Sequence, residues 1–212
     1  MIGDTVSALL AKIEGAATYR EEIERVRLEL NRLTALSEIT TFSDMALLAD
    51  EEKAVAGANF DFSGIPQGYK HLRLIGNLRG DTAAATVNAL LRLNNVSTAN
   101  YYSQYVAGNA TTASAAESLG ATSATLVNVS AGTATADTMG KLIVDIPDYT
   151  EATRMPGGMY QIYRTTTIVS AGVAIVSGGF FLNVAGAVTR ITLTPAAGNW
   201  DTGSRLSLYG IG

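Results

Sequence analysis

Residues 60–78 read FDFSGIPQGYKHLRLIGNL, and this stretch decides the fold class. An apolar segment opens it, a turn with Pro66 and Gly68 follows, and apolar and polar residues then alternate through much of 69–78. A period of two places alternate side chains on opposite faces of a strand, and proline and glycine mark turns. The stretch therefore predicts two short strands joined by a turn.

Segments of the same kind continue to the end of the chain. No stretch after residue 54 keeps a helical period, and the strand–helix alternation of parallel sheets is missing. Short strands between turn residues predict an antiparallel, jelly-roll-like β-sandwich over 54–212. Between residues 107 and 140, 25 of 34 residues are Ala, Gly, Ser or Thr, which predicts thin strands or long surface loops. The expected strands are 58–62, 69–78, 86–93, 101–106, 125–129, 141–146, 159–169, 188–194 and 205–209.

Residues 1–53 differ in composition, because they hold 6 basic and 11 acidic residues, half of all the charged residues of the chain. Their apolar residues recur at steps of three and four, which predicts a helical coiled coil over residues 1–40 that serves as an anchor. A hinge or short helix is expected over 41–53. The alternative is an amphipathic helix that packs on its own domain. The predicted oligomerisation residues are Ile13, Ile23, Val26, Leu30 and Leu33.

Composition excludes several kinds of chemistry. The 212 residues include no cysteine and one histidine, and the net charge is −4, which argues against thiolate metal sites and against nucleic acid as the main partner. A catalytic triad would need His71, which lies in a predicted strand. The carboxylates of the β region cluster only at Asp145, Asp148 and Glu151, where the chain is expected to turn. We therefore predict no enzyme, no metal and no cofactor.

One long uncharged stretch, residues 165–189, is long enough to span a bilayer. It contains four glycines and several β-branched residues, which favour a β-hairpin broken at 177–179 over a membrane helix. We expect no membrane insertion.

Tyrosines supply the candidate binding residues. Tyr101, Tyr102 and Tyr105 offer flat apolar faces with a polar tip, which are typical of glycan or protein recognition. The alternative is that they are half-exposed strand residues of any sandwich. Arg79-Gly80-Asp81 matches an integrin-type tripeptide, but glycine and aspartate also serve ordinary turns.

Several segments together resemble a group of small virion proteins of tailed bacteriophages. The pattern begins with an apolar strand, a Phe-Ser/Thr-x-Ile-Pro turn and a Tyr-Lys-His-Leu strand. An Arg-x-Asn-Asn strand end and Asn-Tyr-Tyr follow, and the pattern closes with Arg-Ile-Thr-Leu, a Gly-Asn turn and Ser-Leu-Tyr-Gly-Ile. The resemblance covers about residues 54–212 and leaves 1–53 outside. The matching residues are 60–74, 92–95, 100–102, 190–193, 198–199 and 207–211.

The resemblance implies a jelly-roll-like domain that is displayed on a virion assembled in the bacterial cytoplasm, usually as a homotrimer and without a catalytic motif. We expect a short fibre whose N-terminal segment binds other virion proteins and whose C-terminal knob contacts a host-surface glycan or protein. A capsid decoration (head-fibre) protein that stabilises the shell is the alternative. A polysaccharide depolymerase that uses Asp145 and Asp148 is a second alternative.

Overall fold

The computed structural model describes residues 24, 25, 28, 45–165 and 173–212. The chain divides into two compact units, residues 1–44 and 45–212. In the first unit, the three described residues are helical and exposed. The predicted coiled coil stays a prediction, because its residues Ile13, Ile23, Val26, Leu30 and Leu33 lie outside the described part of the chain.

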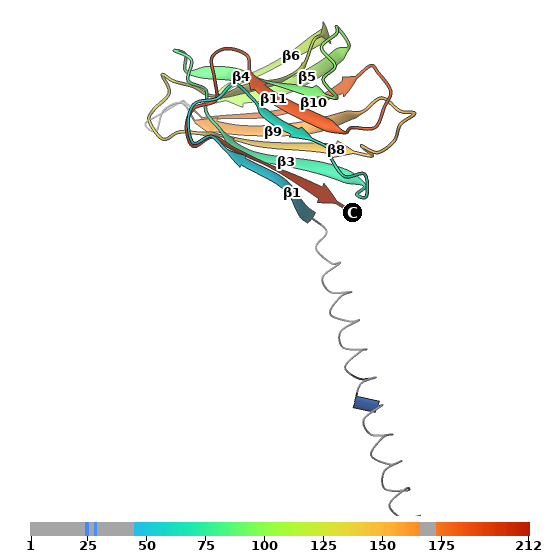
Figure 1. The fold of residues 1–212 in the computed structure, drawn as a ribbon. Helices are drawn as coiled ribbons and strands as arrows, with labels where there is room; N and C mark the ends of the chain where they lie inside the picture. Colours follow the sequence, from blue (N-terminus) through green and yellow to red (C-terminus); the bar gives the residue numbers. More distant parts are fainter. Residues whose placement is uncertain (1–23, 26–27, 29–44, 166–172) are drawn as a thin grey trace, which may run out of the picture. The chain divides into compact units, whose positions relative to one another are not determined.

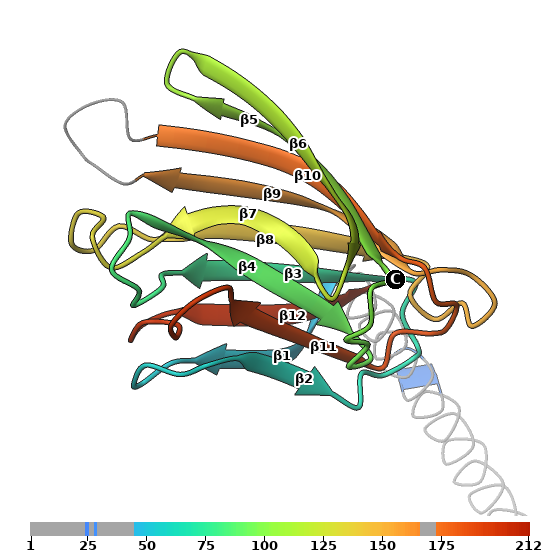
Figure 2. The same cartoon turned by 90° about the horizontal axis from the view of Figure 1, so that it is seen from above.

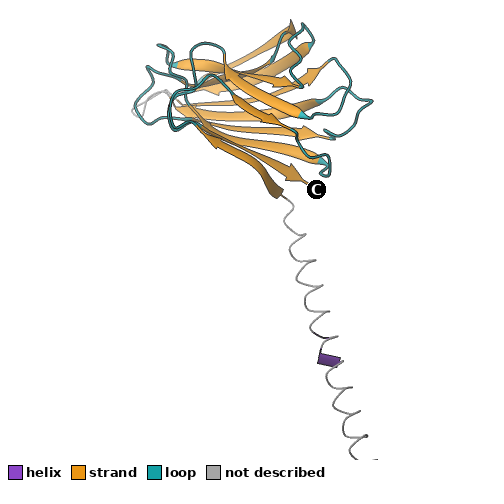
Figure 3. Cartoon of the chain, viewed as in Figure 1, coloured by secondary structure: helices purple, strands orange, loops and turns teal. Residues whose placement is uncertain are grey.

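The second unit is an antiparallel β-sandwich (Figures 1 and 3), which confirms the predicted mainly-β class. Its larger sheet has eight strands in the order β1-β12-β3-β8-β9-β10-β5-β6, and its smaller sheet has four in the order β2-β11-β4-β7. The strands are β1 (Met45–Glu52), β2 (Phe60–Ser63), β3 (His71–Leu78), β4 (Thr86–Leu93), β5 (Tyr101–Asn109), β6 (Thr112–Ala121), β7 (Ala124–Ser130), β8 (Gly140–Pro147), β9 (Gly157–Thr165), β10 (Val173–Leu182), β11 (Arg190–Pro195) and β12 (Arg205–Ile211).

The beginning and the end of this unit are hydrogen-bonded to each other. Strand β12 lies between β1 and β3 in the larger sheet, and β11 lies between β2 and β4 in the smaller one. Figure 2 shows the smaller sheet in front of part of the larger sheet, with the β5–β6 hairpin at one side. The segments that carry the resemblance, 60–74 and 190–211, are therefore neighbours in both sheets.

Apolar side chains from both sheets fill the space between them. Trp200 is fully buried near Phe60, with ring centroids 6.1 Å apart, and its indole N–H donates to the carbonyl of Leu193 at 3.1 Å. Buried leucines from β3, β4, β8 and β12 complete the core. Satisfying the one polar atom of so large a ring keeps its burial favourable.

The first strand corrects the predicted hinge over 41–53, because Met45–Glu52 forms β1. Among the described strands its partner is β12 alone, and the register shifts between Leu47 and Ala49. Charged residues at 50–52 hid this strand in the sequence. They suit the edge of a sheet, where charge discourages pairing with another chain.

The hairpin predicted within the uncharged stretch, with its break at 177–179, is wrong, because a single strand runs through these residues and its partner β9 precedes the stretch. Strands β9 and β10 pair along their length, and Ser177, Gly178 and Gly179 lie inside β10 rather than at a turn. A Cβ at Gly178 would lie 2.5 Å from the ring of Tyr160 and 2.7 Å from the carbonyl oxygen of Gln104. This glycine therefore serves close packing, a recognised use of glycine within strands. Within 107–140, the region rich in small residues, 112–121 forms strand β6. This agrees with the thin strands that were one of the two expectations for this region, the other being long surface loops.

No helix among the described residues is long and apolar enough to cross a lipid bilayer.

An ion pair fastens β2 to β11. The Arg190 guanidinium donates to both carboxylate oxygens of Asp61, with Nε 2.7 Å from Oδ1, and these hydrogen bonds are the main cause that lowers the pKa of Asp61. A carboxyl whose pKa is lower in the folded state contributes stability above its unfolded pKa of about 3.9, and this stability is lost as the pH falls through the folded value.

We therefore expect Asp61→Asn to lower the free energy of unfolding at pH 7, with a loss that shrinks below pH 4 as the wild-type carboxyl becomes protonated. Urea unfolding of both proteins at pH 7 and at pH 3 measures this difference. A loss that is equal at the two pH values would show that the ion pair is not its cause.

Candidate functional site

An open groove of about 650 Å³ lies over β5, β6, β9 and β10. Burial alternates along β10, where Val176, Phe180 and Leu182 face the core while Ser177 and Phe181 do not. We call the face of the larger sheet turned away from the core its outer face. The groove is a hollow in this face.

The floor of the groove lies at Gly179, a residue without a side chain. Gly179 stands in register between Met159 on β9 and Gln104 on β5. A Cβ at Gly179 would have its nearest contact at 3.6 Å, so the space above this residue is open. Adjacent residues of a strand face opposite sides of the sheet. Gly178 therefore packs against Tyr160 in the core, and Gly179, on the outer face, lacks the side chain that would fill the hollow.

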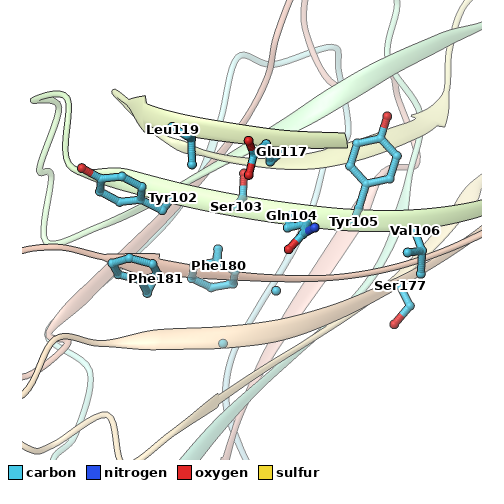
Figure 4. A pocket seen from close by; sticks show the side chains of 12 residues that line it. Tyr102, Ser103, Gln104, Tyr105, Val106, Glu117, Leu119, Ser177, Phe180 and Phe181 are labelled. Carbon is cyan, nitrogen blue, oxygen red and sulfur yellow. The ribbon is translucent and has the colours of Figure 1, made fainter. Parts of the chain in front are cut away.

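Two stacked aromatic rings form one wall of the groove. Tyr102 on β5 lies directly opposite Phe181 on β10, and their rings are nearly parallel at 7°, with centroids 4.9 Å apart. Figure 4 shows the two rings side by side at one end of the groove, with Leu119 of β6 close by. The pair offers a broad apolar surface with the phenolic hydroxyl of Tyr102 at its margin.

Polar groups lie farther along the groove. Gln104 is in register with Glu117 on β6, and Ser177 of β10 also lines the hollow. In Figure 4, Gln104 and Ser177 point to the same side of the sheet. Aromatic surface combined with amide, carboxylate and hydroxyl groups matches the alternating apolar and hydroxyl-bearing surface of a sugar.

The structure corrects the expectation for Tyr101. This residue is fully buried, its hydroxyl accepts the N–H of Leu93 at 2.8 Å, and the carbonyl oxygens of Leu93 and Val96 lie 3.2 Å from it. Burial raises the pKa of this hydroxyl. Tyr101 therefore fixes the connection between β4 and β5 and is not available to a ligand.

Tyr105 borders the groove, but its ring points away from Gln104 and Val106 (Figure 4). It is half-buried and packs against the core. Of the three predicted tyrosines, only Tyr102 presents its ring to the groove, and all three lie on strand β5, which matches the strand predicted over 101–106. Sequence reasoning missed Gln104, Glu117, Leu119, Ser177 and Phe181.

The acidic cluster of the sequence has structural partners. The Arg73 guanidinium holds Asp145, with Nε 2.6 Å from Oδ1 and Nη2 3.0 Å from Oδ2. Asp148 has a φ of 47° in the turn after β8. The Glu151 carboxylate accepts the backbone N–H of Thr153 at 3.0 Å. These contacts account for the carboxylates of Asp145 and Glu151 within the local fold.

His71 and the Arg79-Gly80-Asp81 tripeptide also serve the fold. The Nδ1 atom of His71 accepts the backbone N–H of Asp148 at 3.2 Å. The Arg79 guanidinium is buried and donates to the carbonyl oxygens of Thr135, Thr138 and Ala134 at 2.9–3.0 Å. The Asp81 carboxylate accepts the backbone N–H of Asn199 at 2.7 Å, and this contact lowers its pKa.

Within the described ranges, no three His, Cys, Asp or Glu side chains gather where they could hold a metal ion.

Comparisons with known proteins add little to this geometry. No family model and no curated protein matches the chain. An exo-inulinase from Aspergillus awamori is 8% identical over 78% of this chain and 29% of its own, with a TM-score of 0.39. The galectin LEC-6 from Caenorhabditis elegans is 10% identical over 77% of this chain and 95% of its own, with a TM-score of 0.30. The chain thus spans less than a third of the inulinase, and neither likeness supports a statement about function.

The two adjacent glycines of β10 should respond differently to the same substitution. We expect Gly178→Ala to reduce the free energy of unfolding by about 1–3 kcal/mol, because the new methyl group overlaps Tyr160. Gly179→Ala should change it by less than about 0.5 kcal/mol, since its methyl group enters open space. Chemical denaturation of both variants checks this, and equal losses would contradict the packing described.

The buried hydroxyl of Tyr101 should matter more than the hydroxyl of Tyr102. We expect Tyr101→Phe to destabilise the protein by about 1–3 kcal/mol, because it leaves the N–H of Leu93 without its acceptor. Tyr102→Phe is the matched control and should stay within about 0.5 kcal/mol of the wild type. Urea unfolding measures both, and a larger effect at Tyr102 would overturn the assignment of Tyr101 to the framework.

Proposed function

We propose that this chain is a non-enzymatic structural protein of a tailed-bacteriophage virion. In this proposal, the jelly-roll-like sandwich is a knob displayed on a homotrimeric short fibre. The N-terminal coiled coil joins the fibre to other virion proteins, and the knob contacts a glycan of the host surface.

The observation that carries the virion part of the proposal is the position of the resembling segments. The early segments lie in β2 and β3, and the late segments lie in β11 and β12. Strand β11 pairs with β2, and β12 pairs with β3. The resemblance therefore falls on residues that build one continuous framework. Such agreement between distant segments supports a common fold more strongly than a single short motif would.

The groove supports the binding part of the proposal. It combines the stacked rings of Tyr102 and Phe181 with Gln104, Glu117 and Ser177 on one face of a rigid sheet. Strands hold such groups more rigidly than loops do, which favours a defined binding geometry. A glycan is the ligand class that uses both the aromatic faces and the polar groups.

Binding to bacterial surface polysaccharides tests this role directly. We expect the labelled full-length protein to bind saturably to at least one member of a panel of purified lipopolysaccharides, teichoic acids and capsular polysaccharides. Tyr102→Ala should weaken this binding at least tenfold, because the stacked wall is lost. Tyr209→Ala is the control, since this half-exposed tyrosine lies on β12, outside the groove.

Light scattering on the same sample gives the mass and should show a trimer. A trimer that binds none of the polysaccharides but binds empty capsids would replace the fibre with a decoration protein. Shortening of the polysaccharide chains by the protein would replace it with a depolymerase. A monomer would remove the proposed assembly.

A further inference from the structure

The outer face carries a second apolar feature, at the other end of the strands from the aromatic wall. Six large apolar residues of five strands are between 37% and 61% exposed there. Along β10, Ile175 is six residues from Phe181, which corresponds to about 20 Å at the rise of a strand. We call these residues the aliphatic patch: Ile75, Val106, Ile143, Tyr163, Val173 and Ile175.

The strand registers place the patch residues near one another. Ile75 lies opposite Ile143, and Tyr163 lies opposite Ile175. Tyr163 is the diagonal neighbour of Ile143, whose own position on β9 is occupied by Gln161. Val106 pairs with Ser177, which places it diagonally from Ile175 and within reach of a large side chain. Residues that share a face and adjoin across strands form one surface and not scattered exposures.

The size of the patch is that of a protein interface. The exposed parts of its six side chains amount to roughly 500 Å², which matches the apolar share of the ~800 Å² that each partner buries in a standard interface. Isolated apolar residues are normal on a protein surface, and the largest contiguous apolar patch of a monomer, commonly ~300–600 Å², is often functional.

A hollow adjoins the exposed side chains. It measures about 610 Å³, and small residues such as Gly108, Ala113 and Ala115 line it, with Val106 and Ile175 at its border. Protruding aliphatic side chains and an apolar hollow thus lie on the same surface. A surface that carries both features suits a ring of copies, because the protrusions of one copy fill the hollow of the next, which is the head-to-tail contact of a cyclic trimer.

The β6 strand of the adjoining hairpin has little packing of its own. Every side chain from Thr112 to Glu117 is exposed, on both faces of β6, and among the described strands β6 is an edge strand paired with β5 alone. A strand without a covered face is marginal alone, and an edge with a single charged residue, Glu117, does little to discourage pairing. Contact with another copy would cover both the exposed side chains of β6 and its unpaired edge.

Two ion pairs neutralise part of the charge of the outer face. Asp145 is paired with Arg73, and Asp50 is paired with Arg205, so these charges do not repel a second copy. Lys141 also lies on this face, opposite Tyr163, and its long side chain can keep its charge in water at the margin of a contact.

We propose that a second copy of this chain packs on the aliphatic patch and its hollow, so that the patch is the self-association surface of the sandwich. The inference rests on the self-assembly stated under the proposed function, and it does not depend on the ligand of the groove.

The absence of cysteine from the chain allows a clean test. Ile175→Cys places one thiol on the patch, and Val55→Cys is a control of similar exposure in the loop after β1, with 75% exposed against 61% for Ile175. In the full-length protein, at a concentration where light scattering shows an oligomer, we expect maleimide to react at least tenfold more slowly with I175C than with V55C. Both should react alike in urea. Val106→Cys repeats the test and should become reactive when Ile175→Asp is added.

The remaining outcomes separate the two proposals. Equal labelling rates in an oligomer would overturn the patch as the contact and leave self-assembly intact. Equal rates in a monomer would overturn both. Slow labelling of I175C in a monomer would show that another part of the same chain covers the patch, which also overturns the proposal.

Discussion

The rest of the structure depends on one constraint: the first strands of the sandwich, β1 and β2, pair with its last strands, β12 and β11. Among the described strands, β1 is paired with β12 alone and β2 with β11 alone. Neither sheet is complete until β11 and β12 have joined β2 and β1. This closure pairs residues at least 127 positions apart in sequence, the separation of Ser63 and Arg190, and such contacts require ordering of most of the intervening chain. The eight-stranded sheet that carries the groove and the aliphatic patch exists only because of it.

Sheet geometry then couples the core to the surface. Gly178 and Gly179 are adjacent, so they face opposite sides of β10. One admits the ring of Tyr160, whose burial raises its pKa to about 12, and the other opens the groove. The same alternation buries Tyr101 and exposes the ring of Tyr102. The groove is thus a consequence of how the core packs beneath it, and small changes on either face of this strand affect the other.

The sequence predicted much of this fold and less of the site. Alternation and turn residues predicted most strands and the antiparallel class, because these signals are local. The same signals could not show which of Tyr101 and Tyr102 faces the core, since neighbouring residues of one type look alike until the register is known. Phe181 joins Tyr102 across 79 positions, a contact that only pairing of β5 with β10 creates. Charges at 50–52 concealed β1, and glycines inside β10 resembled a turn, because local patterns do not record tertiary packing.

The two ends of the outer face differ in chemistry, and this difference fits a division of roles. The groove is shallow and covers only part of a ligand, and a single open site of this kind binds a sugar weakly. The aliphatic patch lies farther along the same strands and meets the groove at Val106 and Ser177, while Tyr102 and Phe181 of the aromatic wall do not belong to it. Copies held together in this way would present several grooves at once, and the effective concentration of the second and third sites raises overall affinity by orders of magnitude without any new contact to the ligand. Self-association and surface recognition would therefore depend on one sheet. Strand β10 would contribute Ile175 to self-association and Phe181 to recognition.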